Sequence, residues 1–124
     1  FHTAVNKFCF QAAFDLPVTV WETAFNQKRP YLSINDACRA INHVIKNNLF
    51  NDNIYNVLTK NMTVKEIIKI IKLFRPNLKI KFVKSRIMNQ LSYEVSNLKF
   101  NNTKFNFREK NIVSDIKNEI DLIL

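Results

Sequence analysis

The chain has 124 residues, of which 47% are hydrophobic, and no apolar run approaches the roughly 20 residues of a membrane-spanning helix, so neither a disordered tail nor a membrane protein is expected. Its formal charge of +9 is carried mostly by scattered lysines in a chain also rich in Asn, Ile and Phe, so codon bias accounts for the charge and disfavours nucleic-acid binding. It contains no glycine, which excludes the glycine-rich phosphate loops of dinucleotide-binding and P-loop proteins.

The first half of the chain predicts two helices and three short strands. Apolar residues on one face predict a helix over 3–14. A β-branched and aromatic run at 18–21 is typical of a strand, and a polar loop leads to a second strand at 31–34. An amphipathic helix follows at about 36–46, with a third strand at 54–58.

The second half predicts one strongly specified helix. Thr63 and Glu66 form a Thr-x-x-Glu capping box, and Pro76 ends the apolar repeat that follows. A strand is predicted at 79–83, and a last helix begins near Ile112.

The predicted fold class is α+β, a single small domain of about four helices with short strands over residues 1–124. Without glycine, turns that need a positive φ must use Asn or Asp. The asparagine-containing segments 47–48, 51–53 and 101–102 are placed for this.

The cysteines indicate a cytoplasmic protein. Cys9 and Cys38 lie on predicted helices among apolar neighbours and lack the spacing of a metal site or redox pair. We therefore expect two buried free thiols in a reducing compartment. The start at Phe1, already inside an apolar pattern, suggests a piece of a longer protein.

The residues offer no complete catalytic apparatus. His2 and His43 are far apart and have no partner at helical spacing, so surface or packing roles are expected. Tyr55 and Tyr93 are followed four residues later by Thr or Asn, not by the lysine of a Tyr-x-x-x-Lys pair. We predict no catalytic residue, no metal and no cofactor for this chain alone.

Binding is better supported. Arg29 precedes the 31–34 strand and Arg86 follows the 79–83 strand, where a guanidinium could hold two phosphate oxygens at once. On the residues alone an exposed arginine is the preferred alternative for each, and Trp21 is better explained by closing the core than by stacking on a base. These alternatives stay open on the residues alone.

Several segments together resemble one known family. They are 5–13 (VNKFCFQAA), 16–21 (LPVTVW), 29–40 (RPYLSINDACRA), 54–57 with 63–71, 86–93, and the region from 105 onward. Their order resembles the C-terminal portion of extended short-chain dehydrogenases, the NAD-dependent epimerase/dehydratase family that modifies nucleotide sugars. The family usually has glycine where this chain has Asp15, Glu22, Leu58 and Lys104.

The resemblance implies six substrate-binding residues: Arg29 and Arg86 at the diphosphate, Thr19, Val20 and Trp21 at the base, and Lys7 near a position where the family often has an asparagine facing the nucleotide. It implies a UDP-, dTDP- or GDP-linked sugar as ligand. It also implies that NAD and the catalytic residues belong to a preceding glycine-rich half of the full-length enzyme.

We therefore expect a nucleotide-sugar-binding C-terminal domain that is not catalytic on its own. In the family, the Asp36 helix and the Ile54 strand lean on the glycine-rich half, so their apolar faces should be partly uncovered here and should favour a homo-oligomer. Two alternatives remain: a small basic module that binds nucleic acid or protein, and a degenerate homologue without a ligand.

Overall fold

The computed structural model describes residues 3–84 and 92–124, and within them the α+β class is confirmed. Five helices and four strands occur there, one helix more than expected because α4 is a single turn. The helices are α1 Ala4–Ala13, α2 Ile34–Lys46, α3 Val64–Phe74, α4 Leu98–Asn101 and α5 Lys110–Ile123, with a 3₁₀ turn, η1, at Glu22–Ala24. The strands are β1 Val18–Trp21, β2 Lys28–Tyr31, β3 Lys60–Thr63 and β4 Ile80–Val83.

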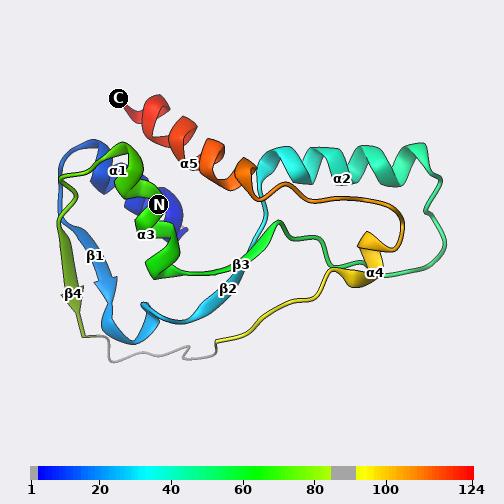
Figure 1. Cartoon of the computed structure of the whole chain (residues 1–124), viewed down its shortest axis with the longest axis horizontal. Coiled ribbons are helices and arrows are strands. Elements are labelled where there is room, and N and C mark those ends of the chain that lie inside the picture. Colours follow the sequence, from blue (N-terminus) through cyan, green and yellow to red (C-terminus); the bar gives the residue numbers. More distant parts are fainter. Residues whose placement is uncertain (1–2, 85–91) are drawn as a thin grey trace.

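The strands form two separate pairs. β1 and β4 are parallel, from Val18 opposite Ile80 to Trp21 opposite Val83. β2 and β3 are antiparallel, with Lys28 opposite Thr63. In Figure 1 these strands lie beside and between two groups of helices: α1, α3 and α5 in one, α2 and α4 in the other.

Two strand predictions were wrong. The second strand lies at Lys28–Tyr31 instead of 31–34, because Ser33 is the N-cap residue of α2 and Ile34 begins that helix. The expected strand at 54–58 is not formed, and β3 lies at Lys60–Thr63, opposite β2. Backbone pairing with a distant partner, not local composition, sets these bounds.

The main core is mainly aliphatic and lies among α1, α3, α5, β1 and β3. Cys9, Ala12, Val18 and Ile71 are completely buried there. The α3 capping box is confirmed and positions that helix.

A second, smaller cluster is aromatic and packs α2 against α4 and the chain that follows. Phe100 is completely buried and contacts the rings of Tyr55, Phe105 and Phe107. His43 packs edge-on against Phe100 and Phe105, so it is the packing histidine that the sequence predicts. His2 lies outside the described residues.

The buried carboxylate of Asp36 joins the two clusters. It accepts hydrogen bonds from Thr59 Oγ1 (2.8 Å), the Arg39 guanidinium (2.6 Å), the Arg108 backbone N–H (3.1 Å) and Asn111 Nδ2 (2.9 Å). These donors come from α2, α5 and two connecting segments. A buried charge is stable when it is satisfied in this way.

Among the described residues, four have left-handed backbone in the absence of glycine: Asp15 (φ 54°), Asn48 (49°), Asp52 (55°) and Lys104 (67°). The turn predictions at 47–48 and 51–53 are confirmed. The one at 101–102 is wrong, because Asn101 ends α4 and the turn falls at Lys104.

The two thiols differ, which corrects the expectation that both are buried. Cys9 is buried in the main core, and burial, with a smaller effect from Glu119, raises its pKa to about 12. Cys38 is exposed, because it lies on the outer face of α2.

Candidate functional site

A cavity of about 430 Å³ opens beside β1, between α1 and β2. Five of the six residues predicted to bind substrate line it: Lys7, Thr19, Val20, Trp21 and Arg29. Arg86, the sixth, lies outside the described residues. Residues from three separate segments therefore meet at one hollow, although their role there stays a prediction.

Strand β1 forms one wall of this cavity. Val20 is buried, whereas Trp21 is 55% exposed at the end of the strand. The Val18 N–H donates to Lys79 O at 2.9 Å, so strand alternation turns the backbone of Thr19 and Trp21 towards the edge opposite β4. At that edge the Thr19 N–H donates to Gln11 Oε1 at 3.2 Å. This edge and the indole ring are surfaces on which a planar heterocycle could lie.

Arg29, on β2, is held in a fixed orientation. One guanidinium nitrogen donates to Lys28 O (2.9 Å) and another to Gln27 Oε1 (3.2 Å). The guanidinium also stacks on the Tyr93 ring, 5.0 Å from its centroid. A pre-oriented planar cation of this kind suits an oxyanion that accepts two hydrogen bonds.

The segment around Tyr93 is tied to β2. The Lys28 N–H donates to Ser92 Oγ at 3.0 Å, and the Tyr93 N–H donates to Lys28 O at 3.3 Å. This is the described end of the 86–93 segment that the resemblance implies for a second arginine. The stack of Arg29 on Tyr93 is a contact that sequence reasoning missed, since it joins residues 64 positions apart.

The electrostatics of the cavity favour an anion. Lys7 and Arg29 line it, no carboxylate does so among the described residues, and the first turn of α1 reaches it at Thr3 and Ala4. The positive end of a helix dipole adds to the attraction. The cavity can therefore hold a planar group and a negative charge next to each other.

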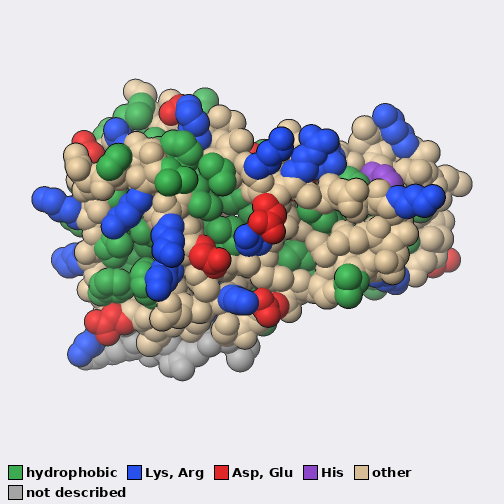
Figure 2. Space-filling view, in the orientation of Figure 1, with side chains coloured by type: hydrophobic (Ala, Val, Ile, Leu, Met, Phe, Trp, Pro, Cys, Tyr) green, Lys and Arg blue, Asp and Glu red, His purple; other side chains and the backbone are tan. Residues whose placement is uncertain are grey.

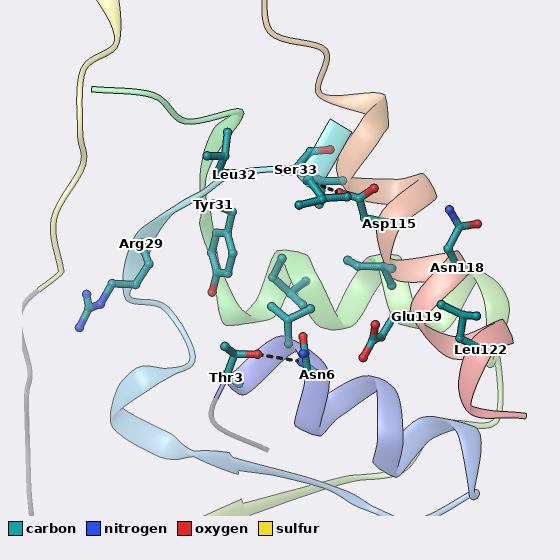
Figure 3. Close-up of a pocket in the computed structure, with 16 residues that line it drawn as sticks. Thr3, Asn6, Arg29, Tyr31, Leu32, Ser33, Asp115, Asn118, Glu119 and Leu122 are labelled. Carbon is teal, nitrogen blue, oxygen red and sulfur yellow. Dashed lines mark hydrogen bonds between the residues drawn. The ribbon is translucent and has the colours of Figure 1, made fainter. Parts of the chain in front are cut away.

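A larger cavity of about 710 Å³ adjoins the first, and the two share Thr3, Ala4, Arg29 and Tyr31. Figure 3 shows Glu119 extending from α5 towards α1, which carries Asn6, while Arg29 points away on the other side.

Sequence reasoning missed the polar groups of α5 that line this larger cavity. Asp115, Asn118 and Glu119 recur at helical spacing next to the apolar stripe of α5, which is the signal that could have found them. Asp115 Oδ2 also accepts from the Ile34 N–H at 3.0 Å and so caps α2.

Tyr31 stands where the two cavities meet. Burial raises the pKa of its phenol, and the charge of Arg29 offsets part of that rise. Nearby, Ser33 Oγ is buried and has no hydrogen-bond partner within residues 3–84 and 92–124. The larger cavity therefore offers hydroxyl and carboxylate groups on an otherwise apolar wall.

The outer face of α2 carries an uncovered apolar stripe. Ile34, Ile41 and Ile45 are 70%, 63% and 60% exposed, and Cys38 lies in line with them. Ile54 is also 86% exposed, and it lies in irregular chain, not in a strand. The expectation of an uncovered apolar face is thus met at α2, whereas the strand expected to carry the second such face, at 54–58, is not formed.

Within the described residues, no His, Cys, Asp and Glu cluster could hold a metal ion, and no helix is both long and apolar enough to cross a membrane. Comparison with protein-family models and with curated proteins found no match.

Proposed function

We propose that this chain is the nucleotide-sugar-binding C-terminal portion of an NAD-dependent epimerase/dehydratase-like protein, without turnover of its own. The observation that carries the proposal is the cavity beside β1. It gathers Lys7, Arg29 and the Thr19–Val20–Trp21 run from α1, β2 and β1.

The cavity suits the two chemical parts of a nucleoside diphosphate. The base would lie against Trp21 and the open edge of β1. The diphosphate would accept hydrogen bonds from the oriented guanidinium of Arg29, with Lys7 adding charge. A volume of about 430 Å³ is within the usual range for small-ligand sites.

The sugar would extend past Tyr31 into the adjoining larger cavity. Asn6 and Glu119 offer an amide and a carboxylate there, and such groups bind hydroxyls. Binding the nucleotide handle at a distance from the reacting carbon would orient the sugar ring.

The residues of this chain do not fit NAD. The cofactor's pyrophosphate needs a backbone approach that glycine provides, and the chain has none. In the proposal, NAD binds a separate glycine-rich half of the full-length protein.

The uncovered stripe Ile34–Cys38–Ile41–Ile45 would be covered by that other half, or by a second copy when this chain is alone. Sedimentation at increasing concentration tests this. Reversible association is expected, and an Ile41→Asp/Ile45→Asp variant should stay monomeric.

The lysines do not favour the nucleic-acid alternative. On the face in Figure 2, Lys and Arg side chains are spread from one end to the other, while hydrophobic ones gather over α1, α3 and α5. A nucleic-acid module is expected to cluster its charges, and its affinity would fall steeply with salt.

The decisive experiment uses Trp21, the single tryptophan, as a fluorescent reporter during titration with UDP-glucose, dTDP-glucose and GDP-mannose. At least one should quench it saturably, and Arg29→Met should weaken that binding about 10-fold or more because charged hydrogen bonds are lost. Lys72→Met, which removes one positive charge from the exposed face of α3 outside the cavity, should bind like the wild type. No saturable signal from any of the three, or equal losses in both variants, would refute the proposal.

A further inference from the structure

A third hollow, of about 390 Å³, lies at the far end of α2, away from the β1 cavity. It is bounded by the last turns of α2 and by the 104–108 segment, and four of its lining residues are cations: Arg39, Lys46, Lys104 and Arg108. No carboxylate lines it among the described residues. Figure 2 shows Lys and Arg side chains around the purple histidine surface at this end.

One cation is rigidly placed. Arg39 forms an ion pair with buried Asp36 (2.6 Å), donates to Asn106 O (3.0 Å) and stacks on the Phe105 ring at 5.0 Å. Asp36 also accepts from the Arg108 backbone N–H, which fixes the start of that side chain. The carboxylate lies behind the wall and is already satisfied by four donors.

The other three cations lack carboxylate partners. Lys46, Lys104 and Arg108 make no ion pair with any residue in 3–84 or 92–124. Lys46 alone is explained by the negative end of the α2 dipole, which favours a cation in the last turn. The α2 dipole does not explain Lys104 and Arg108, because they come from another segment.

Lys104 is an unfavourable choice for its backbone position. Its φ of 67° disfavours residues other than Gly, Asn and Asp, and the neighbouring chain uses Asn at 101, 102 and 106. The structure therefore keeps a lysine where an asparagine would cost less. A required side-chain charge is a physical reason for that choice.

The rest of the lining is polar. Asn42, Asn47 and Asn106 contribute amide groups, and the ring of Phe105 is the main apolar surface. Converging cations and amides bind tetrahedral oxyanions well, because each oxygen can accept a charged or neutral hydrogen bond. The confined shape suits a small ligand better than an extended chain.

We propose that this hollow, the α2-end site, binds the phosphate or pyrophosphate group of a small metabolite, independently of the β1 cavity. Arg39 and Arg108 would hold its oxygens, with Lys46 and Lys104 balancing the charge.

The test is a titration of the ¹⁵N-labelled chain with orthophosphate and pyrophosphate at constant ionic strength, followed by NMR. Amide shifts should saturate at 46–47 and 104–108, more tightly for pyrophosphate. Lys104→Asn/Arg108→Gln should weaken pyrophosphate binding about 10-fold or more. Asparagine tolerates the backbone at 104, and the Arg108 backbone bond is kept, so the variant should fold.

Two controls separate a built site from general attraction. Lys69→Gln/Lys72→Gln removes the same charge from the outer face of α3 and should bind pyrophosphate like the wild type. Shifts at 46–47 and 104–108 are scored separately from any shifts at the β1 cavity, where Arg29 is proposed to bind a diphosphate. Shifts spread over all lysine-bearing surfaces, or equal losses in the two double variants, would overturn the proposal. So would a dT12 oligonucleotide that outcompetes pyrophosphate, because it would indicate a phosphodiester backbone as ligand.

Discussion

The two hydrophobic clusters of this protein are built in different ways. The main core packs three helices and two strands through mainly aliphatic side chains at regular spacing. The second cluster packs α2 against one helical turn and irregular chain through Phe100, Phe105, Phe107 and Tyr55. A few large rings there bury apolar area that regularly spaced aliphatic side chains bury in the main core.

Asparagine side chains stabilise the irregular chain near the second cluster. Asn61 accepts from the Val95 N–H (3.0 Å) and donates to Val95 O (2.9 Å), so its amide replaces a strand partner. Asn97 Nδ2 similarly donates to Leu58 O at 3.0 Å. Backbone groups that no ladder satisfies are thus satisfied by amides. Irregular structure here is specified by individual side chains instead of by periodicity.

The largest expected effect concerns the two thiols, one in each region. With a thiol reagent at pH 8, Cys38 should react like an exposed thiol, and Cys9 at least about 1,000-fold more slowly, because it must wait for opening of the core. Mass spectrometry of the labelled chain measures both rates.

The pH dependence of Cys9 provides a check. Its pKa is raised from 9.0 to about 12 in the folded state, so stability is complete below pH 9 and is progressively lost as pH rises towards 12. A Cys9→Ser variant cannot serve as the control, since it adds a buried hydroxyl. Cys9→Ala should remove this alkaline loss, and fast labelling of Cys9 at neutral pH would contradict a closed core.

The second prediction tests whether the aromatic cluster depends on one ring. Phe100→Ala should lower the free energy of unfolding by about 3–5 kcal/mol, since the ring is completely buried among other rings. Phe50→Ala, 71% exposed, should cost under about 1 kcal/mol. Urea unfolding measures both, and similar values would show that the cluster does not rely on Phe100.

The third prediction concerns the start of α3 in the main region. Thr63 Oγ1 accepts from the Glu66 N–H at 3.2 Å, and Glu66 Oε2 accepts from the Thr63 N–H at 2.7 Å. Thr63→Ala should therefore cost about 1 kcal/mol. The bond from the Thr63 N–H lowers the pKa of Glu66 below its ordinary 4.5.

The lowered pKa of Glu66 predicts a loss of folding stability at acid pH. The Glu66 contribution is present above pH 4.5 and is lost as pH falls through the lowered value. Glu66→Gln keeps an acceptor for Thr63 but does not titrate, so its stability should change less in acid. The same loss of stability at acid pH in the wild type and in Glu66→Gln would rule out a role for this carboxylate.

The smallest effect is expected at Lys104, beside the aromatic cluster. Lys104→Gly should raise the free energy of unfolding by about 0.5–1 kcal/mol, and the melting temperature slightly with it. The reason is that relief of the backbone strain at φ 67° exceeds the entropy cost of glycine. Thermal unfolding of the variant and of Lys99→Gly, placed inside α4, gives the comparison. Lys99→Gly should be destabilising.

The contrast between the regions explains which predictions from sequence succeeded. The α3 helix was predictable because Thr63, Glu66 and its apolar repeat are local signals. The bounds of β2 and β3 were not, since each depends on a partner about 30 residues away. The aromatic cluster was also invisible, because Phe100 and Tyr55 meet only in the folded chain.

The candidate site shows the same limit. Lys7, Trp21 and Arg29, which the resemblance implies as substrate-binding residues, line one cavity, and their binding role stays a prediction. The stack of Arg29 on Tyr93 and the polar face of α5 need tertiary structure. The α2-end hollow was missed for the same reason, because Arg39 and Lys46 come from α2 whereas Lys104 and Arg108 come from a segment much later in the chain.

Asp36 illustrates how narrow the chemistry of one position can be. All four of its contacts bring a hydrogen towards it, so the site accepts only a side chain that has lone pairs and no hydrogen of its own to offer. Asparagine has nearly the same shape, but its NH₂ group could then face the donor groups of Arg39 and Asn111, and two donors cannot form a hydrogen bond. The rate of amino-acid substitution at this position should therefore be far lower than at the equally buried aliphatic positions, where one hydrocarbon side chain can replace another.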